Sequence, residues 1–227
     1  TKDQPFFLNL CHHAVHTPIE GKAQLVERYK KKIAPQMHHQ NEGYAAMTDS
    51  LDQSVGRVLA KLEELDIADR TVIFFSSDNG GYINEYNKRT VTDNYPLRSG
   101  KGSLYEGGIR VPLIVLWPGV TKAGSVCHQP VSSIDFYPTM LEMAGLSGDS
   151  QHNSNVDGVS LAPLLKNPTA DLNRESLYWH YPHYYPTTSP VSAIRQGDWK
   201  LLEYFEDNHV ELYNLRDDLG EKNDLSA

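Results

Sequence analysis

The sequence predicts an α/β protein, with a mixed sheet flanked by helices and a small antiparallel β-sheet subdomain at the C-terminal end. Two observations lead to this class. Short apolar runs alternate with helical patterns up to about residue 146, which is the order expected of packed layers of strands and helices. From about residue 186, alternating runs are joined by a turn, as in an antiparallel hairpin. We therefore divide the chain into residues 1–146, the layered part, and residues 147–227, connecting loops and the small subdomain.

The N-terminal part contains one expected strand and two expected helices. The run "PFFLNL", residues 5–10, has the composition of a fully buried strand. Because a buried strand rarely opens a domain, we expect the natural protein to have further residues before it. A weak helical pattern follows at residues 22–32. A clear amphipathic helix is expected over residues 44–65, where apolar residues recur three and four positions apart: Leu51, Val55, Val58, Leu59, Leu62 and Leu65.

The middle of the chain predicts two strands and a helix. The runs "TVIFFS", residues 71–76, and "VPLIVLWPG", residues 111–119, have the apolar and β-branched composition of buried parallel strands. Residues 132–145 predict a helix, with Asp135 as its N-cap and Gly145 as its C-terminal stop. This alternation of strand and helix predicts a sheet that is covered on both faces.

The C-terminal part predicts a hairpin and two loops. Residues 199–205 and 210–215 alternate in polarity around the turn "EDNH", and "SAIR", residues 192–195, is a candidate neighbouring strand. Residues 147–157 are rich in Ser, Asn, Asp and Gly, and residues 179–190, "WHYPHYYPTTSP", combine aromatic residues with prolines. Both segments are expected to be loops.

Composition excludes several classes of protein. The formal net charge of -8 argues against nucleic acid or an anionic membrane as the main partner. No apolar run approaches the roughly 18 residues that indicate a membrane span, and the first residues lack the pattern of a signal peptide. With only Cys11 and Cys127, the chain is no disulfide scaffold, and the two thiols either pair with each other or stay unpaired and buried.

The first candidate site is "FFSSDNGG", residues 74–81. If the preceding run is a strand, Asp78 and Asn79 lie at the sheet edge where α/β proteins bind ligands. A carboxylate and an amide carbonyl are hard oxygen donors, which suit Ca²⁺ and also Mg²⁺. Taken alone, the same four residues Asp-Asn-Gly-Gly favour a plain turn.

Two further segments carry candidate residues. "CHHAVHTP" places His12, His13 and His16 just after an expected strand, where a histidine can donate a hydrogen bond to an anionic or leaving oxygen. No accompanying residues have the spacing of a zinc site. "PLRSGKGSLYEGGIRVP" places Lys101 among four glycines, so its backbone can fold tightly around an anion, although the spacing of a P-loop is absent. Singly, each residue is typical of an ordinary surface position.

Together, these segments resemble the C-terminal half to two-thirds of a type I sulfatase, an arylsulfatase-like member of the alkaline phosphatase superfamily. The matching segments follow family order across nearly all 227 residues: "PFFLNLCHHAVHTP", "YAAMTDSLDQSVGRVLAKLEELDIADRTVIFFSSDNGG", "PLRSGKGSLYEGGIRVPLIVLWPG", "SSIDFYPTMLEMAGL", "DGVSLAPLL", "AIRQGDWKLLEYF" and "VELYNLRDDLGEKNDLS". The resemblance implies a sulfatase-like mixed sheet, residues 1–146 being the C-terminal part of the catalytic domain, and hydrolysis of sulfate esters.

The resemblance also implies roles for particular residues. In the family, the Asp-Asn pair after this strand helps to bind calcium, which implies that Asp78 and Asn79 are metal ligands. The histidine before Thr-Pro and the lysine of Gly-Lys-Gly contact the sulfate group, which implies catalytic roles for His16 and Lys101. His13, His180 and His183 are weaker candidates for contacts with the substrate. The aromatic loop 179–190 either lines the substrate pocket or acts as a hydrophobic clamp.

One departure from the family limits what this chain can do. Family members use a formylglycine nucleophile made from a C/S-x-P/A-x-R motif, and neither cysteine nor any serine here fits that motif. We expect the motif, and the other calcium ligands, in a missing N-terminal portion. The 227-residue chain alone is therefore expected to be inactive. The natural substrate would be an aryl sulfate, a sulfated glycan or a sulfolipid, and the resemblance implies export to the periplasm, the cell exterior or the lysosome.

Two other functions stay open at this point. The first is hydrolysis of a phosphonate or phosphate ester, because the superfamily shares its metal and lysine chemistry. The second is a binding module without catalytic activity, because the chain lacks a nucleophile.

Overall fold

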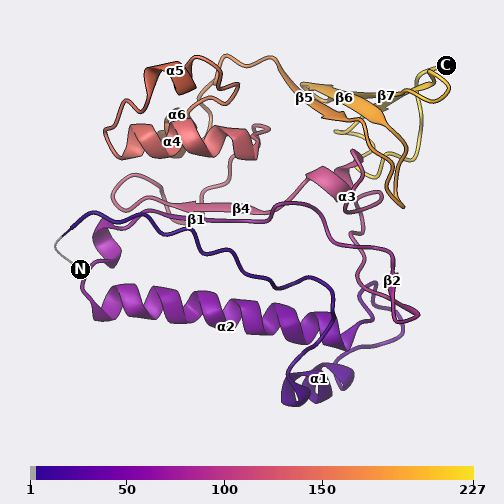
Figure 1. The fold of residues 1–227 in the computed structure, drawn as a ribbon, viewed down its shortest axis with the longest axis horizontal. Coiled ribbons are helices and arrows are strands. Elements are labelled where there is room, and N and C mark those ends of the chain that lie inside the picture. Colours follow the sequence, from indigo (N-terminus) through magenta and orange to yellow (C-terminus); the bar gives the residue numbers. More distant parts are fainter. Residues whose placement is uncertain (1–3) are drawn as a thin grey trace.

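The computed structural model describes residues 4–227, which form helices alternating with three antiparallel sheets (Figure 1). The helices are α1 (Ala23–Lys30), α2 (Glu42–Glu64), α3 (Glu106–Ile109), α4 (Phe136–Met143), α5 (Ser150–Asn153) and α6 (Ala162–Lys166), with 3₁₀ turns at Ala68–Arg70 and Ser133–Asp135. The strands are β1 (Ile73–Ser76), β2 (Glu85–Tyr86), β3 (Arg89–Thr90), β4 (Leu113–Leu116), β5 (Ser176–Tyr181), β6 (Val191–Gln196), β7 (Trp199–Tyr204) and β8 (Val210–Asn214). Of these described helices, none is both long and apolar enough to cross a membrane.

Helix α2 confirms the helix predicted from the apolar stripe. It begins at an N-cap residue, Asn41, whose side chain accepts a hydrogen bond from the Tyr44 N–H at 3.0 Å. Glu42 in its first turn complements the positive end of the helix dipole. Helix α1 confirms the weaker pattern, and it is tied to α2 because Arg28 and Tyr29 both bond Asp49, at 3.1 and 2.9 Å.

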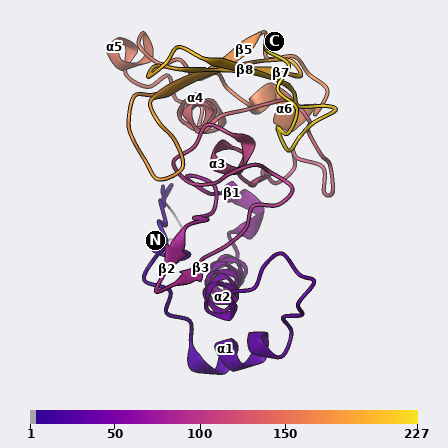
Figure 2. The same cartoon turned by 90° about the vertical axis from the view of Figure 1, so that its right-hand side faces the viewer.

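The strands β1 and β4 pair with each other between two helices. Figures 1 and 2 show α4 on one side of this pair and α2 on the other, so the expected layers of helices on both sides are present. The covering is incomplete, because Ile114 and Leu116 of β4 stay 63% and 47% exposed. The expected parallel direction is wrong, because the strands are antiparallel and Ser76 lies opposite Leu113. An apolar run indicates burial but not direction. The connection 77–112 leaves β1 and enters β4 at the same end of the pair, and this geometry makes the strands antiparallel.

The strand predicted at residues 5–10 does not form. The segment is extended but belongs to none of the sheets in residues 4–227, and its side chains are exposed, with Phe6 at 54%, Phe7 at 77% and Leu8 at 61%. A strand needs a neighbouring strand that offers hydrogen-bonding groups, and no described strand pairs with this segment. The prediction of a buried strand is therefore wrong for this structure.

The helix predicted at residues 132–145 forms with a different cap. Asp135 stands at the predicted N-cap position of α4, but its side chain makes no capping bond to that helix. Ser132 caps the preceding 3₁₀ turn, and the two residues form a capping box in which the Asp135 carboxylate accepts from the Ser132 N–H at 2.8 Å. Gly145, at φ +66°, ends the helix as predicted. Asp135 is fully buried, and its carboxylate is held by Arg174 at 2.6 and 2.9 Å. A short helix, α5, lies within the predicted loop 147–157, where Asp149 caps it by accepting from the His152 N–H.

The C-terminal sheet has the order β5-β6-β7-β8, and its β7–β8 hairpin and β6 are confirmed. Strand β5 was missed, because Trp179 to Tyr181 were assigned to a loop on account of the nearby prolines. In the structure Trp179 pairs with Ala193 and Tyr181 with Val191. The inner face of the sheet packs on the chain just before α3, and the core there consists of Leu104, Tyr105, Val191, Ala193, Leu202, Tyr204, Tyr213 and Leu215.

A buried group of charges joins this sheet to α3. Lys200, fully buried on β7, donates to Glu106 at 3.0 Å and to Glu221 at 2.8 Å. The second oxygen of Glu221 accepts from the Glu106 N–H at 2.7 Å. Burial raises the pKa of Glu221, although Lys200 opposes that shift. Cys11 and Cys127 are unpaired, and both are exposed rather than buried.

Candidate functional site

The Asp78 loop follows β1 directly and is fixed against α3. Ser77 Oγ donates to the Asn79 carbonyl at 3.0 Å, and Asn79 Nδ2 donates to the Gly80 carbonyl at 2.8 Å. The Gly80 N–H then donates to the Gly108 carbonyl at 2.8 Å. A Cβ atom on Gly80 would lie 1.7 Å from the Gly107 carbonyl oxygen, so only glycine allows this approach.

The Lys101 loop is bonded to the same segment. The Lys101 N–H donates to the Gly81 carbonyl at 3.0 Å. The Asn94 side chain joins both loops, since it accepts from the Gly81 N–H and donates to the Gly81 and Ser99 carbonyls, all within 3.0 Å. Residues 77–81 and 99–102 therefore form one unit, and sequence reasoning gave no signal for the role of Asn94.

His16 and Lys101 meet at this unit although 85 positions separate them. Lys101 Nζ lies 3.1 Å from His16 Nε2, and His16 Nδ1 lies 2.8 Å from the Thr17 carbonyl oxygen. Because a carbonyl can only accept, Nδ1 carries the hydrogen, and Nε2 offers its lone pair to the ammonium group. The His13 ring lies beside His16, with 5.6 Å between ring centroids. The structure thus brings together three of the residues that the sequence singled out.

The Asp78 and Asn79 oxygens are available to a cation. In residues 4–227 the exposed Asp78 carboxylate has no hydrogen-bond or ion-pair partner, and Asn79 uses its amide nitrogen, which leaves its amide oxygen without one. These hard oxygens fit Ca²⁺ or Mg²⁺. No group of three His, Cys, Asp or Glu residues with metal-binding geometry occurs in the described part of the chain. The donor set therefore fits such an ion but supplies only part of its shell.

The loop after β5 supports Lys101 from the other side. Thr187 Oγ1 donates to the Lys101 carbonyl at 2.8 Å. The Tyr185 ring covers Gly102, where a Cβ atom would come within 2.1 Å of the ring. Two hydrogen bonds of 3.0 Å between Tyr185 and Thr188 hold this loop closed. The contact of Thr187 with Lys101 has no signal in the sequence.

His180 and His183 have other partners. His180 Nδ1 lies 2.8 Å from Ser192 Oγ on β6, and its ring is 5.6 Å from that of Phe205. His183 packs edge-on against Tyr181 at 5.3 Å. Both histidines are exposed, and nothing in the described residues joins either of them to Lys101. Their role in substrate binding stays a prediction.

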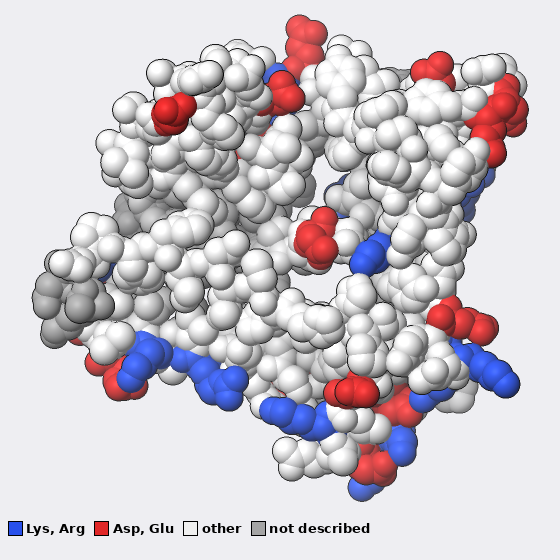
Figure 3. Space-filling view, viewed as in Figure 1, with Lys and Arg blue, Asp and Glu red and all other residues white. Residues whose placement is uncertain are grey.

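The unit lies beside a hollow in the molecular surface. Figure 3 shows openings in the middle of one face, between the β1–β4 pair and α3, with acidic and basic side chains at their edge.

A second network holds the Lys101 loop against the C-terminal sheet. The Arg98 guanidinium lies 3.8 Å from the centroid of the Tyr105 ring and donates to Tyr213 Oη at 2.8 Å. Tyr105 and Tyr213 both donate to Glu211, at 2.6 and 2.8 Å. Burial, together with these bonds, raises the pKa of both phenols. The tyrosines thus stay neutral donors that anchor the loop.

Comparison with known proteins identifies two family models that match the chain. The model described as Sulfatase matches residues 1–146, and the model described as N-sulphoglucosamine sulphohydrolase, C-terminal, matches residues 99–227. A sulfatase from Formosa agariphila is 41% identical over 99% of this chain, which corresponds to 42% of its own length.

Solved structures agree with this assignment. The crystal structure of Ps i-CgsB has a TM-score of 0.81 at 34% identity, over 98% of this chain and 46% of that one. The same protein in complex with k-i-k-neocarrahexaose gives a TM-score of 0.77 at 33% identity, over 94% and 44% of the two chains. BT4656 in complex with its substrate, D-glucosamine-2-N,6-O-disulfate, gives 0.67 at 29%, over 89% and 41%.

This chain spans a little under half the length of these relatives. The family model covers more than half of the chain, and the Formosa relative aligns with nearly all of it. The arrangement of helices around β1 and β4, with a small C-terminal antiparallel sheet, agrees with those structures. The chain belongs to the sulfatase family, the type I sulfatases of the alkaline phosphatase superfamily.

Proposed function

We propose that this chain supplies part of the active site of a sulfuric ester hydrolase, in which His16 and Lys101 bind the sulfate group. The observation that supports this most is the 3.1 Å distance between Lys101 Nζ and His16 Nε2. Two nitrogen groups from distant segments converge on one point. The Lys101 loop is also bonded to the Asp78 loop, whose carboxylate and amide oxygens no described residue uses. Membership of the sulfatase family makes a sulfate group the anion that fits this point.

The roles of the two residues follow from their chemistry. The Lys101 ammonium would donate to a sulfuryl oxygen, on which negative charge grows during transfer. His16 keeps Nε2 directed at the same place because Nδ1 is held by the Thr17 carbonyl. Once protonated, Nε2 would donate to a second sulfuryl oxygen or to the leaving oxygen. Thr187 and Asn94 would act only by positioning the Lys101 loop.

Asp78 and Asn79 would hold a calcium ion, with Mg²⁺ as the alternative. Bound there, the cation would polarise a sulfuryl oxygen and offset its charge. Calcium takes about six to eight oxygen ligands, and these two residues supply only a fraction of them. We propose that the other ligands and the formylglycine nucleophile lie outside this sequence, so that the 227-residue chain is inactive alone.

For the substrate we propose a sulfated glycan, with an aryl sulfate as a small model substrate. Ps i-CgsB and BT4656 are solved with an oligosaccharide and a disulfated sugar. The loop that carries Tyr185 and Thr187 packs on the Lys101 loop, so a sugar bound there would meet aromatic side chains. We also propose that the protein is exported, as its resemblance to the family implies. Cell fractionation would test this.

The decisive experiment measures release of sulfate from an aryl sulfate by the full-length protein and by its Lys101→Ala variant. Loss of one donor to a developing oxyanion should lower kcat by roughly 10²- to 10³-fold. Lys122→Ala, an exposed lysine elsewhere, is the matched control and should keep full activity. A variant as active as the wild type would contradict the role of Lys101, and faster turnover of a matched phosphate ester would favour the phosphatase alternative. Activity in the 227-residue chain alone would contradict the proposed missing nucleophile.

A further inference from the structure

We propose that Glu221, near the C-terminal end of the chain, is a positioning residue for the reaction, because it fixes the loop that carries Lys101. Its side chain is fully buried, so it acts on the site through other residues and does not contact a substrate itself. The inference rests on the proposed function, since it concerns the geometry in which Lys101 would bind the sulfate group.

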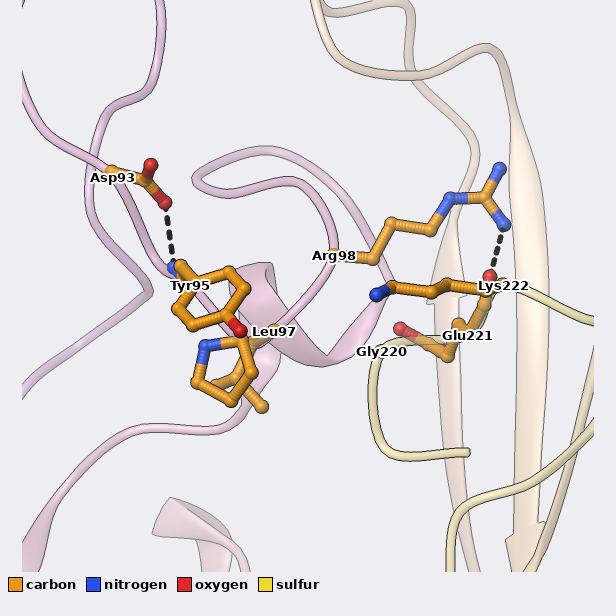
Figure 4. A pocket seen from close by; sticks show the side chains of 8 residues that line it. Asp93, Tyr95, Leu97, Arg98, Gly220, Glu221 and Lys222 are labelled. Carbon is orange, nitrogen blue, oxygen red and sulfur yellow. Dashed lines mark hydrogen bonds between the residues drawn. The ribbon is translucent and has the colours of Figure 1, made fainter. Parts of the chain in front are cut away.

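The backbone of Glu221 holds Arg98, which lies three positions before Lys101. Arg98 Nη1 donates to the Glu221 carbonyl at 2.9 Å, and Figure 4 shows this bond between two stretches of chain that are far apart in sequence. The same guanidinium donates to Tyr213 Oη at 2.8 Å and lies 3.8 Å from the Glu211 carboxylate. The C-terminal segment is therefore bonded directly to the start of the Lys101 loop.

The carboxylate of Glu221 holds the first turn of α3. One oxygen accepts from the Glu106 N–H at 2.7 Å, and the other accepts from Lys200 Nζ at 2.8 Å. Because Glu221 and Lys200 are both fully buried, water does not compete for these bonds. Helix α3 has four residues, too few to be stable in isolation, so its position depends on contacts of this kind.

Helix α3 connects the Glu221 carboxylate to the candidate site. The Gly107 N–H donates to the Arg98 carbonyl, and the Gly108 carbonyl accepts from the Gly80 N–H, both at 2.8 Å. A Cβ atom on Gly107 would lie 2.3 Å from the Arg98 carbonyl oxygen, so helix and loop are packed backbone against backbone. Because such packing leaves no space for adjustment, a displacement of α3 moves the Lys101 loop with it.

The conformation of Glu221 indicates that its side chain is needed at this point. Its backbone has φ +50°, in the left-handed region that few residues other than Gly, Asn and Asp adopt. The surrounding turn is held by the Asp218 carboxylate, which accepts from the Lys222 and Asn223 N–H groups, both at 2.7 Å. A glutamate therefore occupies a backbone position that suits glycine better, and the bonds of its carboxylate offset that strain.

A cycle of single and double variants of the full-length protein tests whether Glu221 acts through Lys101. Glu221→Gln keeps the size of the side chain but replaces one acceptor oxygen by a donor, so one of the two bonds of the carboxylate is lost. In the wild-type background kcat for an aryl sulfate should fall about 10-fold, since a misplacement of about 1 Å can cost up to 10²-fold. KM should change little, as expected for an interaction of the transition state.

The double variant gives the deciding comparison. In the Lys101→Ala background, Glu221→Gln should lower kcat by less than about 3-fold, because the group that Glu221 positions is gone and only an effect through the Asp78 loop remains. An equal loss in both backgrounds would overturn the proposal. If Glu221→Gln does not fold, Glu221→Asp takes its place in the cycle, because it keeps the charge that Lys200 needs and shortens the side chain by one methylene group.

A matched control separates positioning from loss of stability. Arg174→Met removes the cation of another fully buried carboxylate, that of Asp135, and within residues 4–227 no hydrogen bond or ion pair joins these two residues to the Asp78 or Lys101 loops. This variant should be less stable to urea than the wild type, as Glu221→Gln should be, yet keep the wild-type kcat when activity is measured per folded molecule. A similar fall of kcat in both variants would mean that stability alone explains the loss.

An NMR measurement separates this proposal from the proposed function. His16 Nε2 lies 3.1 Å from Lys101 Nζ, so its ¹⁵N chemical shift reports the position of Lys101 whether or not a sulfate ester is hydrolysed. In Glu221→Gln the signal should move toward its position in Lys101→Ala, and in Arg174→Met it should stay as in the wild type. An unchanged signal in Glu221→Gln would overturn the positioning role. Full activity of Lys101→Ala would instead contradict the proposed function, and the signal would still show whether Glu221 sets the position of Lys101.

Discussion

The C-terminal sheet and the β1–β4 pair are both antiparallel, but only the sheet is well buried. On its inner face Val191 and Leu202 are fully buried. In β4 every second residue is open, with Ile114 at 63% exposure and Leu116 at 47%. Similar apolar sequences therefore reach different degrees of burial, because burial depends on what packs against a strand and not on the strand alone.

The candidate site takes residues from both the well-buried region and the open region. Lys101 belongs to a loop that Asn94, Thr187 and the core around Tyr105 hold in place. His16 belongs to an exposed segment that joins none of the described sheets. Lys101 is thus held in place by packing before a ligand binds. The position of His16 depends mainly on its two contacts, with the Thr17 carbonyl and with Lys101 Nζ.

The largest effect is expected when the buried region loses its central charge. Lys200→Met would leave the buried Glu221 without its cation and Glu106 with only the more distant Arg110 and Arg195, at 3.4 and 3.8 Å. Breaking such a buried group costs about 3–5 kcal/mol. The free energy of unfolding, measured with urea, should fall by that amount. Lys61→Met, which removes an exposed partner of Glu64, should change it by less than about 1 kcal/mol. Equal effects of the two variants would show that the C-terminal region is not the better stabilised part.

Sequence periodicity predicted the parts of the fold that local patterns determine. Helix α2 follows from its stripe of apolar residues, and the β7–β8 hairpin follows from alternation around a turn. The burial of Lys200 follows from the same alternation, because Lys200 points to the same face of β7 as Leu202 and Tyr204. No local pattern predicts the relative direction of β1 and β4 or whether residues 5–10 join a sheet. Both depend on which other segments supply hydrogen bonds.

The candidate site was predictable in its residues but not in its contacts. The order of the family-like segments along the chain indicated His16 and Lys101 as site residues, and the structure places His16 Nε2 and Lys101 Nζ 3.1 Å apart. Asn94 and Thr187 were missed because they act through backbone carbonyls, of Gly81 and Ser99 for Asn94 and of Lys101, 86 positions away, for Thr187. Such contacts need no particular local pattern, so only the folded chain shows them.

A smaller effect is expected where the two regions join. In Gly80→Ala the new Cβ would meet the Gly107 carbonyl oxygen at 1.7 Å, and both atoms belong to fixed backbone. The loops must separate, at a cost typical of overpacking, about 1–3 kcal/mol. Urea unfolding would measure it. Gly56→Ala is the control, because its Cβ meets nothing within 4 Å in the middle of α2 and should stabilise the helix by up to about 1 kcal/mol. If both variants were more stable than the wild type, the close approach of Gly80 to the Gly107 carbonyl would be contradicted.

The smallest effect is expected in the open region, at the pair of Glu42 and Arg89. The hydrogen bonds from Arg89, at 2.9 and 2.7 Å, lower the pKa of the Glu42 carboxyl from 4.5 to about 2. Because the folded state lowers this pKa, the pair stabilises the protein above pH 4.5, and the stabilisation is lost as the pH falls toward 2. Arg89 is half exposed, so solvent screening limits the contribution to about 1 kcal/mol.

Urea unfolding of the wild type and Glu42→Gln at a series of pH values would test this pair. The difference in the free energy of unfolding should be largest near pH 6 and should fall steeply toward pH 2, where the wild-type carboxyl is about half protonated. Glu64→Gln, whose partner Lys61 is also exposed, should differ from the wild type by less than about 0.5 kcal/mol throughout. A Glu42 effect as large as that of Lys200→Met would mean that exposed ion pairs hold the N-terminal helices as firmly as burial holds the C-terminal sheet, and the contrast between the two regions would not stand.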